Sequence, residues 1–306
     1  MTSDTLHKSG DHIEWNESFY FNFYDRHKDV CAFMRIGLKP NKDEKSMFCC
    51  IMLPDGSIAA SRDSSASADG VLSANGLSYK MVEAERKWSL SFSGPMKVMG
   101  RDAETITPCS FDIEFSAKMP IFDYRDCVSG KNERISQSVA SEHLEQMGVY
   151  SGTVTVGEDT YHISATGERD HSWGARDWNA PKMWMWLTAQ ASEDLALNVT
   201  KLTVEQGEVD AGFIRTDATT HPLQGIDIDA RYDESGAPTG FSMIMAAKDG
   251  KRYPVEATVI KCLPMPFASD DGKTVSVMYE TLSRYSICGK EGFGIAEFLI
   301  RKEKKM

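Results

Sequence analysis

The stretch SFYFNFYD, residues 18–25, indicates the fold class, because ring-bearing apolar side chains alternate with more polar ones along it. An extended strand sends successive side chains to opposite faces, so the alternation predicts a strand with one buried face. Phe19, Phe21 and Phe23 would lie on that face. The same period recurs in KWSLSFSG (87–94) and SFDIEFSA (110–117). The chain is therefore predicted to be all-β, with antiparallel strands.

Turn residues divide these strands at short intervals. MFCCIMLPDGSIAASRD (47–63) predicts a hairpin around Asp55 and Gly56, and YSGTVTVGEDTYHISATG (150–167) predicts another around Gly157 and Glu158. Alternating segments continue through the second half of the chain. Close hairpins throughout an all-β chain favour sandwiches or barrels.

One segment departs from the alternation. KNERISQSVASEHLEQMG (131–148) lacks proline and internal glycine, and its apolar residues recur near the helical period at Ile135, Val139 and Met147. The segment predicts one amphipathic helix that ends at Gly148. On such a helix His143 and Glu145 would not share a face, and both are interpreted as exposed polar residues.

The length of 306 residues and the 41% hydrophobic composition are typical of a globular protein with one large or two average domains. A complete set of strands with a helix precedes Gly167, and a second set of strands follows it. We therefore predict an N-terminal β-domain at 1–167 and a C-terminal β-domain at 168–306.

The net charge of −11, from 34 basic and 45 acidic residues, disfavours nucleic acids and anionic membrane surfaces as partners. The sequence contains no run of about 18 apolar residues, so it predicts no membrane-spanning helix. The N-terminus lacks a signal-peptide pattern, and seven scattered cysteines form no CxxC pair, so we expect a cytoplasmic protein with reduced thiols. The oligomeric state is open, with a homodimer as one option.

GERDHSWGARDW (167–178) concentrates charge and aromatic surface in twelve positions. If the segment continues a strand, Arg169, His171 and Trp173 share one face. A carboxyl group beside tryptophans in a dry pocket can act as a general acid near neutrality. The candidate catalytic residues are Asp170, His171, Arg176 and Asp177. The alternative is a structural latch, in which the arginines tie the aspartates across a domain interface.

A hydrophobic ligand would be bound by aromatic residues near this motif. KMWMWLTAQ (182–190) places its tryptophans on one face of a strand and its methionines on the other. Glu280 and Glu297 either point into such a cavity or face solvent. The candidate substrate-binding residues are Tyr24, Trp173, Trp178, Trp184, Trp186 and Glu280. No phosphate loop, nucleophile elbow or HExxH motif occurs, so no cofactor and no metal are expected.

Several of these stretches resemble a known family. NESFYFNFYD with CAFMRIGLKPN (16–41), HLEQMGVYSGTV leading into GERDHSWGARDW (143–178) and, more loosely, SRYSICGKEGFGIAEFLI (283–300) are similar to the two-domain lipocalin-like proteins related to carotenoid 1,2-hydratase and kievitone hydratase. The string RDHSWGxRDW resembles a bacterial subgroup of that superfamily. The resemblance implies two consecutive lipocalin-like β-barrels. It also implies cofactor-free addition of water to an isoprenoid double bond or, in more distant relatives, pericyclic cyclisation in an apolar cavity.

The leading hypothesis is a cofactor-independent hydratase, dehydratase or isomerase that acts on a small, hydrophobic, alkene-bearing molecule such as a terpenoid. Asp170 or Asp177 would protonate the substrate, His171 would relay a second proton, and the tryptophans would shelter a cationic intermediate. Two other hypotheses remain open. One is a non-catalytic carrier of an apolar ligand, and the other is a pericyclase-like cyclisation scaffold.

Overall fold

The computed structural model describes residues 3–100, 103–128, 130, 135, 142–176, 181–268 and 274–303. These residues lie almost entirely in antiparallel strands, which confirms the predicted all-β class. They divide into two compact units. The first unit combines Met1–Phe122 with Glu142–Arg176, and the second combines Asp123–Ser141 with Asp177–Met306. Among the described residues, no helix has the length and apolar character needed to cross a bilayer.

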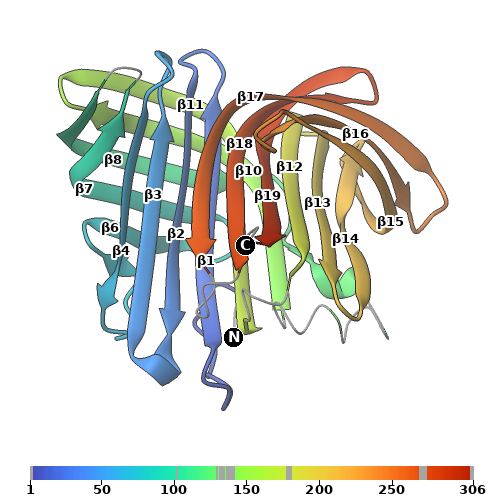
Figure 1. Cartoon of the computed structure of the whole chain (residues 1–306), viewed down its shortest axis with the longest axis horizontal. Helices are drawn as coiled ribbons and strands as arrows, with labels where there is room; N and C mark the ends of the chain where they lie inside the picture. Colours follow the sequence, from blue (N-terminus) through green and yellow to red (C-terminus); the bar gives the residue numbers. More distant parts are fainter. Residues whose placement is uncertain are drawn as a thin grey trace. The chain divides into compact units, whose positions relative to one another are not determined.

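An 11-stranded antiparallel sheet forms the first unit (Figure 1). Its strands are β1 (Trp15–Asp25), β2 (Val30–Lys39), β3 (Glu44–Met52), β4 (Ile58–Ala66), β5 (Ser73–Ala74), β6 (Leu77–Glu83), β7 (Lys87–Met99), β8 (Glu104–Ala117), β9 (Phe122–Asp123), β10 (Glu142–Val156) and β11 (Asp159–Ala175). The order is β4-β3-β2-β1-β11-β10-β8-β7-β6-β5, with β9 beside β10. A further pairing of β4 with β7 joins eight of these strands into a ring. A 3-10 helix, η1 (Pro40–Lys42), lies between β2 and β3.

The aromatic alternation of β1 builds the core of this unit. Phe19, Phe21 and Phe23 are buried, as predicted, and belong to one hydrophobic cluster. The ring centroid of Trp88 lies 5.6 Å from that of Phe19 and 5.7 Å from that of Phe21. Each buried aromatic side chain contributes roughly 2 to 3 kcal/mol of hydrophobic stabilisation. The alternation in residues 18–25 thus sets the orientation of β1 against the core.

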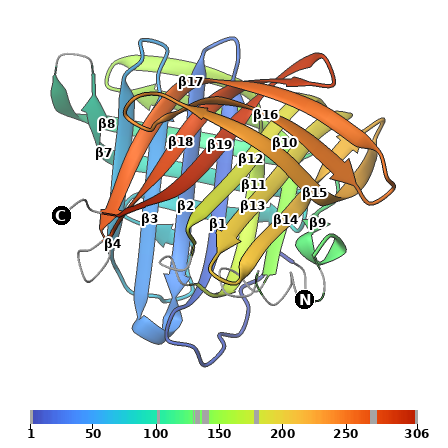
Figure 2. The same ribbon diagram turned by 45° about the vertical axis from the view of Figure 1, so that its right-hand side comes forward.

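The second unit is a closed eight-stranded antiparallel barrel (Figure 2). Its strands, in order around the barrel, are β12 (Met183–Ser192), β13 (Leu195–Val204), β14 (Gly207–Thr216), β15 (Thr219–Tyr232), β16 (Pro238–Ala247), β17 (Arg252–Ala268), β18 (Thr274–Ile287) and β19 (Lys290–Glu303). The short η2 helix (Tyr124–Asp126) also belongs to this unit. Large side chains occupy the interior, where the ring of Phe241 contacts those of Tyr285 and Phe298.

Both predicted hairpins are confirmed. Met52 of β3 pairs with Ile58 of β4, and Val156 of β10 pairs with Asp159 of β11 across a two-residue turn. In that turn Gly157 has a φ of 60°, which a glycine adopts at little cost. All seven cysteines carry free thiols, and five of them are buried.

The predicted helix is wrong over residues 142–148, which begin strand β10. Residues 131–134 and 136–141 of that prediction lie outside the described residues. Gly148 is not a helix end: a Cβ atom there would lie 2.3 Å from a ring carbon of Phe115 and 2.5 Å from the carbonyl oxygen of Ser116. This glycine is therefore required by the close approach of β8, and not by a turn.

The predicted boundary near Gly167 falls inside β11, and the first unit continues to Arg176. Gly167 pairs with Phe23 of β1, and a Cβ atom on it would lie 1.9 Å from the carbonyl oxygen of Asn22. The glycine allows two strands to approach within a sheet, so it does not mark a linker. Residues 123–141, which precede β10 in the sequence, belong to the second unit. The sequence analysis did not predict that the second unit includes this segment.

Candidate functional site

The two faces of β11 carry different groups of the motif. Arg169 and His171 pair in register with Phe21 and Phe19, so they lie on the core face of the sheet, and Trp173 shares that face as predicted. Asp170, one residue away, lies on the opposite face. Asp170 and His171 therefore do not converge on one point, and the hypothesis that they act together on one substrate is corrected by the strand geometry.

Asp170 belongs to a buried group on the outer face of the sheet. The Nε2 atom of His143 contacts the Asp170 carboxylate and lies 2.8 Å from Oε1 of Glu145. His143 and Glu145 come from β10, and Asp170 pairs in register with Glu145. Two carboxylates thus share one imidazole, and all three side chains are buried.

The charges in this group determine its protonation. Burial acts to lower the pKa of His143, but Asp170 and Glu145 outweigh burial and raise that pKa to about 10. Burial acts to raise the pKa of Asp170, but His143 and then Arg176 outweigh burial and hold it below its ordinary value. These charges favour an imidazolium at His143 and an ionised Asp170, which is the opposite of the protonation state that a general acid needs.

The remaining charged residues of the motif are placed as follows. Arg176 is buried, and its Nη2 donates to the hydroxyl of Ser172 at 2.9 Å. Its charge also acts on Asp170, as noted above. Asp177 and Trp178 lie outside the described residues, and their predicted roles stay predictions.

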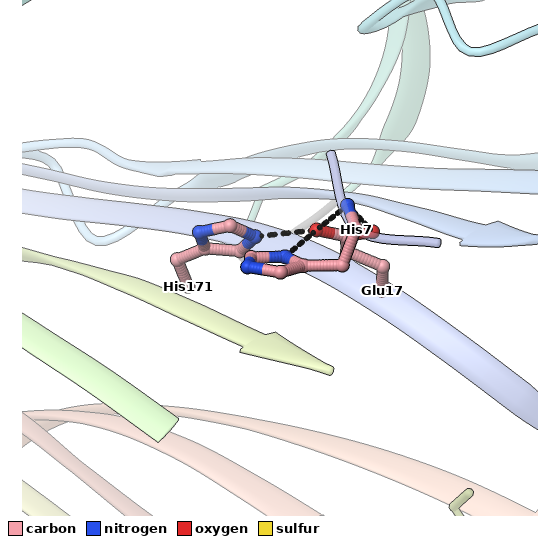
Figure 3. A group of neighbouring side chains, drawn as sticks. All are labelled: His7, Glu17 and His171. Atoms are coloured by element: carbon pink, nitrogen blue, oxygen red, sulfur yellow. Dashed lines mark hydrogen bonds and ion pairs between the residues drawn. The ribbon is translucent and has the colours of Figure 1, made fainter. Parts of the chain in front are cut away.

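A second group of titratable side chains lies on the core face of β11 (Figure 3). Oε1 of Glu17, from β1, lies 2.8 Å from Nε2 of His171 and 2.8 Å from Nδ1 of His7. The His7 ring stacks on Trp173, with centroids 3.7 Å apart, and the His171 ring stacks on Phe19 at 3.9 Å. The side chains of Glu17 and His171 are almost fully buried, whereas that of His7 is 26% exposed.

Hydrogen bonding indicates where the protons of this group lie. Nδ1 of His171 lies 2.7 Å from the carbonyl oxygen of Ser3, which can only accept, so Nδ1 carries a proton. In a neutral His171, Nε2 would then direct a lone pair at Glu17. At 2.8 Å this arrangement requires a cation between the two atoms, either a proton or a metal ion.

The contacts of Arg169 indicate a structural role for its side chain within the first unit. Its Nη1 lies 2.7 Å from Oδ1 of Asp4, its Nε donates to Oε1 of Gln146 at 2.7 Å, and its guanidinium lies 5.8 Å from the centroid of Trp88. Gln146 in turn donates to the carbonyl oxygens of Glu85 and Met119. Arg169 therefore joins the N-terminal segment to β10 inside the first unit.

In the second unit, the tryptophans of β12 lie on the outer face of the barrel. Met185 belongs to the barrel core, so Trp184 and Trp186 project from the opposite face, where both are buried. Trp186 pairs in register with Glu297 of β19, and Glu297 pairs with Glu280 of β18. Directly paired residues share a face, so the tryptophan and both carboxyl groups lie side by side.

Glu280 and Glu297 form a pair of carboxyl groups on adjacent strands. Glu280 is fully buried, and Glu297 is half-buried. Burial, followed by the charge of the neighbouring Glu297 carboxylate, raises the pKa of Glu280 well above its ordinary value. Two adjacent buried carboxyl groups disfavour a second negative charge, and the raised pKa favours the protonated form of Glu280. The sequence left open whether Glu280 faces a cavity or solvent, and the full burial of its side chain excludes solvent.

The same face of the barrel continues into polar hydroxyl groups. Thr200 of β13 pairs in register with Trp186. The hydroxyl of Tyr124, from η2, lies 2.8 Å from Oγ1 of Thr200 and donates to Oδ1 of Asn198 at 2.6 Å. An aromatic residue, a carboxyl pair and hydroxyl groups therefore occupy adjacent positions on the outer face of the second unit.

Two predicted binding residues lie elsewhere. Trp173 contacts His7 on the core face of β11. The hydroxyl of Tyr24, at the end of β1, donates to Asp29 at 3.1 Å, and burial together with Asp29 raises its pKa above the ordinary value. Both residues belong to the first unit, whereas the carboxyl pair belongs to the second.

The sequence interpretation missed several members of these groups. His143 and Glu145 were assigned to different faces of a helix, but residues two apart share a face on a strand. A predicted strand over HLEQMGVYSGTV would have placed His143 and Glu145 on the same face. His7 and Glu17 carried no local signal, because they are far from His171 in sequence, and Tyr124 likewise meets Thr200 only through the fold.

The fold and the buried titratable groups define a class of two-unit antiparallel β-protein. Residues 1–302 match the family model described as "Domain of unknown function (DUF7064)", so the chain belongs to this family. No curated protein matches the sequence.

Three solved structures are similar to the whole chain. CghA with Sch210972 has a TM-score of 0.62 at 9% identity, covering 99% of this chain and 94% of that one. Kievitone hydratase from Nectria haematococca has a TM-score of 0.60 at 11% identity, covering 99% and 98%. An AttH-like protein from Nitrosomonas europaea has a TM-score of 0.57 at 10% identity, covering 97% of each chain. The predicted resemblance is confirmed at the level of the fold.

Proposed function

We propose that this protein is a lyase that adds water to, or removes it from, a small hydrophobic molecule, with Glu280 and Glu297 as its acid and base. The observation that carries the proposal is the carboxyl pair, in which Glu280 is fully buried opposite Glu297 and its pKa is raised well above the ordinary value. Active sites are where such perturbed pairs concentrate, and enzymes use them for acid-base chemistry. The fold shared with kievitone hydratase supports this reaction class.

In the dehydration direction, Glu280 donates its proton to the substrate hydroxyl, and the carbon–oxygen bond breaks to release water. Glu297 accepts the proton from the neighbouring carbon, and that carbon–hydrogen bond supplies the electron pair of the new double bond. One proton has moved from Glu280 to Glu297, and its return between the two carboxyl groups restores the starting state. Hydration is the reverse, and double-bond migration uses the same two transfers.

The substrate class follows from the residues beside the pair. Trp186 lies next to Glu297 in register, so its ring can contact an apolar substrate and stabilise positive charge that develops on carbon. Tyr124 and Thr200 supply hydroxyl groups at the other side of Trp186. We therefore propose an alkene or alcohol of isoprenoid type. Glu280 is a better candidate for the acid than Asp170, because His143 lowers the pKa of Asp170.

The carrier hypothesis receives less support. A lipocalin-like carrier holds its ligand inside the barrel, but in the interior of the second unit the ring of Phe241 contacts those of Tyr285 and Phe298. No particular observation favours a pericyclase-like scaffold over a hydro-lyase. A bound ligand that is never turned over would revive the carrier hypothesis.

The test begins with native mass spectrometry of the purified chain, which would reveal a co-purified small molecule. Acyclic terpene alcohols and alkenes, together with any such molecule, are then incubated in ¹⁸O-labelled water. Mass spectrometry follows the appearance of the label in the alcohol. Wild-type protein should incorporate the label, and Glu280→Gln should lower the rate by roughly 10²- to 10⁴-fold.

The matched control is Glu256→Gln, which changes an exposed glutamate on the neighbouring strand β17 and should leave turnover unchanged. If Glu280→Gln turns over at the wild-type rate, the assignment of the acid is wrong. If both variants and the wild type bind a ligand without label exchange, the chain is a carrier.

A further inference from the structure

We infer that His7, Glu17 and His171 form a site for one divalent transition-metal ion of the Zn²⁺ type. The three side chains offer one ligand atom each, and these atoms lie within 4.8 Å of one another. Two imidazoles and one carboxylate are a donor set that Zn²⁺ commonly takes in proteins, with a fourth position left for water. This inference concerns the first unit and does not rest on the proposed carboxyl pair.

The strongest argument is the orientation of His171. Its Nδ1 donates to the carbonyl oxygen of Ser3 at 2.7 Å, which leaves the lone pair of Nε2 directed at Glu17. Metal-binding histidines characteristically donate their second ring nitrogen to a carbonyl or carboxylate, because that bond fixes the tautomer and the ring plane. A doubly protonated His171 would make the same two contacts, so metal titration is the measurement that separates a bound ion from a shared proton.

The other two ligands are also held in place. The backbone N–H of His7 donates to both carboxylate oxygens of Glu17, at 3.0 Å to Oε2 and 3.1 Å to Oε1, and so holds the carboxylate beside the imidazoles. Stacking on Trp173 fixes the His7 ring, and stacking on Phe19 fixes the His171 ring. Figure 3 shows both imidazoles directed at the same carboxylate.

The required adjustment is small. Each imidazole nitrogen lies 2.8 Å from Oε1 of Glu17. Bonds of about 2.0 to 2.1 Å to a tetrahedral ion separate two ligand atoms by about 3.3 Å, so each pair would open by about half an ångström. The partly exposed His7 lies in the N-terminal segment and offers both an entry path and the freedom for this movement.

A second group, His143, Glu145 and Asp170, has a similar composition. It is a poorer site, because it supplies one imidazole, and because all three side chains are buried. Its two carboxylates already share the His143 imidazolium, which a metal ion would have to displace. The geometry therefore favours the group on the core face of β11.

The test uses the full chain, stripped of metal with a chelator and titrated with Zn²⁺ by calorimetry and with Co²⁺ as an optical probe. We expect one ion per chain, proton release on binding and a higher melting temperature with Zn²⁺. Glu17→Gln and His7→Ala should each lose this binding. The matched controls, Glu145→Gln on β10 and His162→Ala at an exposed position of β11, should keep it.

Three results would overturn the inference. One is a wild-type chain that takes up no stoichiometric Zn²⁺ or Co²⁺, since His7, Glu17 and His171 would then share only protons. Another is binding that persists in both Glu17→Gln and His7→Ala. The last is binding that disappears in Glu145→Gln while Glu17→Gln keeps it. Because His7 lies outside the strands, His7→Ala keeps the test decisive if Glu17→Gln does not fold.

Discussion

Asp170 and His171 are consecutive in the sequence, yet they project from opposite faces of β11 and contact different histidine-carboxylate groups. Asp170 contacts His143 on the outer face, and His171 lies 2.8 Å from Glu17 on the core face. One strand therefore carries two buried titratable groups that are separated by the sheet itself. Substitutions on the two faces should therefore remove different hydrogen-bond partners, while the two groups stay coupled through the charge of His171, which lowers the pKa of Asp170.

Replacing His143 with glutamine should destabilise the first unit strongly. His143→Gln removes the imidazolium that Asp170 and Glu145 share and leaves two buried carboxylates facing each other. Breaking a buried ion pair in this way costs about 3 to 5 kcal/mol. The free energy of unfolding in urea measures the loss.

His162→Gln is the matched control, since His162 is exposed on β11 and its substitution should change stability by less than about 0.5 kcal/mol. A loss for His143→Gln no larger than that of the control would show that the group is not held together by charge.

The raised pKa of His143 also predicts a pH dependence. The pKa rises from 6.5 to about 10 on folding, so the stabilisation from His143 is fully present below pH 6.5 and is lost as the pH rises toward 10. Wild-type stability should therefore fall between these values. Urea midpoints at several pH values test this, with His143→Gln as the comparison, because the variant should lack this contribution to the fall. Parallel curves for the two proteins would contradict the assignment.

Much of the fold follows from the sequence, because the relevant patterns are local. The alternation of Phe19, Phe21 and Phe23 predicted both the strand and its buried face, and the turn at Gly157 and Glu158 predicted the pairing of β10 with β11. The error at residues 142–148 came from sparse apolar residues that fit a helical period as well as a strand. Gly148 reinforced it, because a packing glycine and a helix-ending glycine look alike in sequence.

The candidate sites were less predictable, because they depend on contacts between distant residues. RDHSWG drew attention to β11, but its partners His7, Glu17 and His143 come from other segments. The pKa direction of Asp170 could not be predicted from the sequence either. An apolar pocket would have raised that pKa, whereas the neighbouring His143 lowers it. Glu280 and Glu297 carried a signal only in their positions on the last two strands, where register places them opposite each other.

Gly167 should be essential for the pairing of β1 with β11. In Gly167→Ala the new methyl group would meet the carbonyl oxygen of Asn22 at 1.9 Å, and a backbone atom cannot move aside as a flexible side chain does. We expect a loss of about 3 kcal/mol, at the upper end of what overpacking costs. Thermal or urea unfolding measures it.

Gly225→Ala, in β15, provides the control, because a Cβ atom there would meet nothing within 4 Å. Its stability should stay within about 1 kcal/mol of the wild type. Equal losses in the two variants would mean that the close approach of β1 and β11 is not what requires glycine at position 167.

Glu280 should impose a stability cost that grows with pH. Its pKa is raised on folding, so the stabilisation associated with its proton is fully present below the ordinary value of 4.5 and is lost as the pH rises toward the folded value. Glutamine is uncharged at every pH, so Glu280→Gln should gain on the wild type by on the order of 1 kcal/mol per pH unit above pH 5. Urea unfolding from pH 5 to 8 measures this difference.

Glu256→Gln, on the exposed face of β17, should show no such trend. A stability gain in Glu280→Gln that accompanies lost turnover would separate a catalytic carboxyl from a merely structural one, whereas a pH-independent difference would mean that Glu280 is ionised in the folded chain and holds no proton to donate.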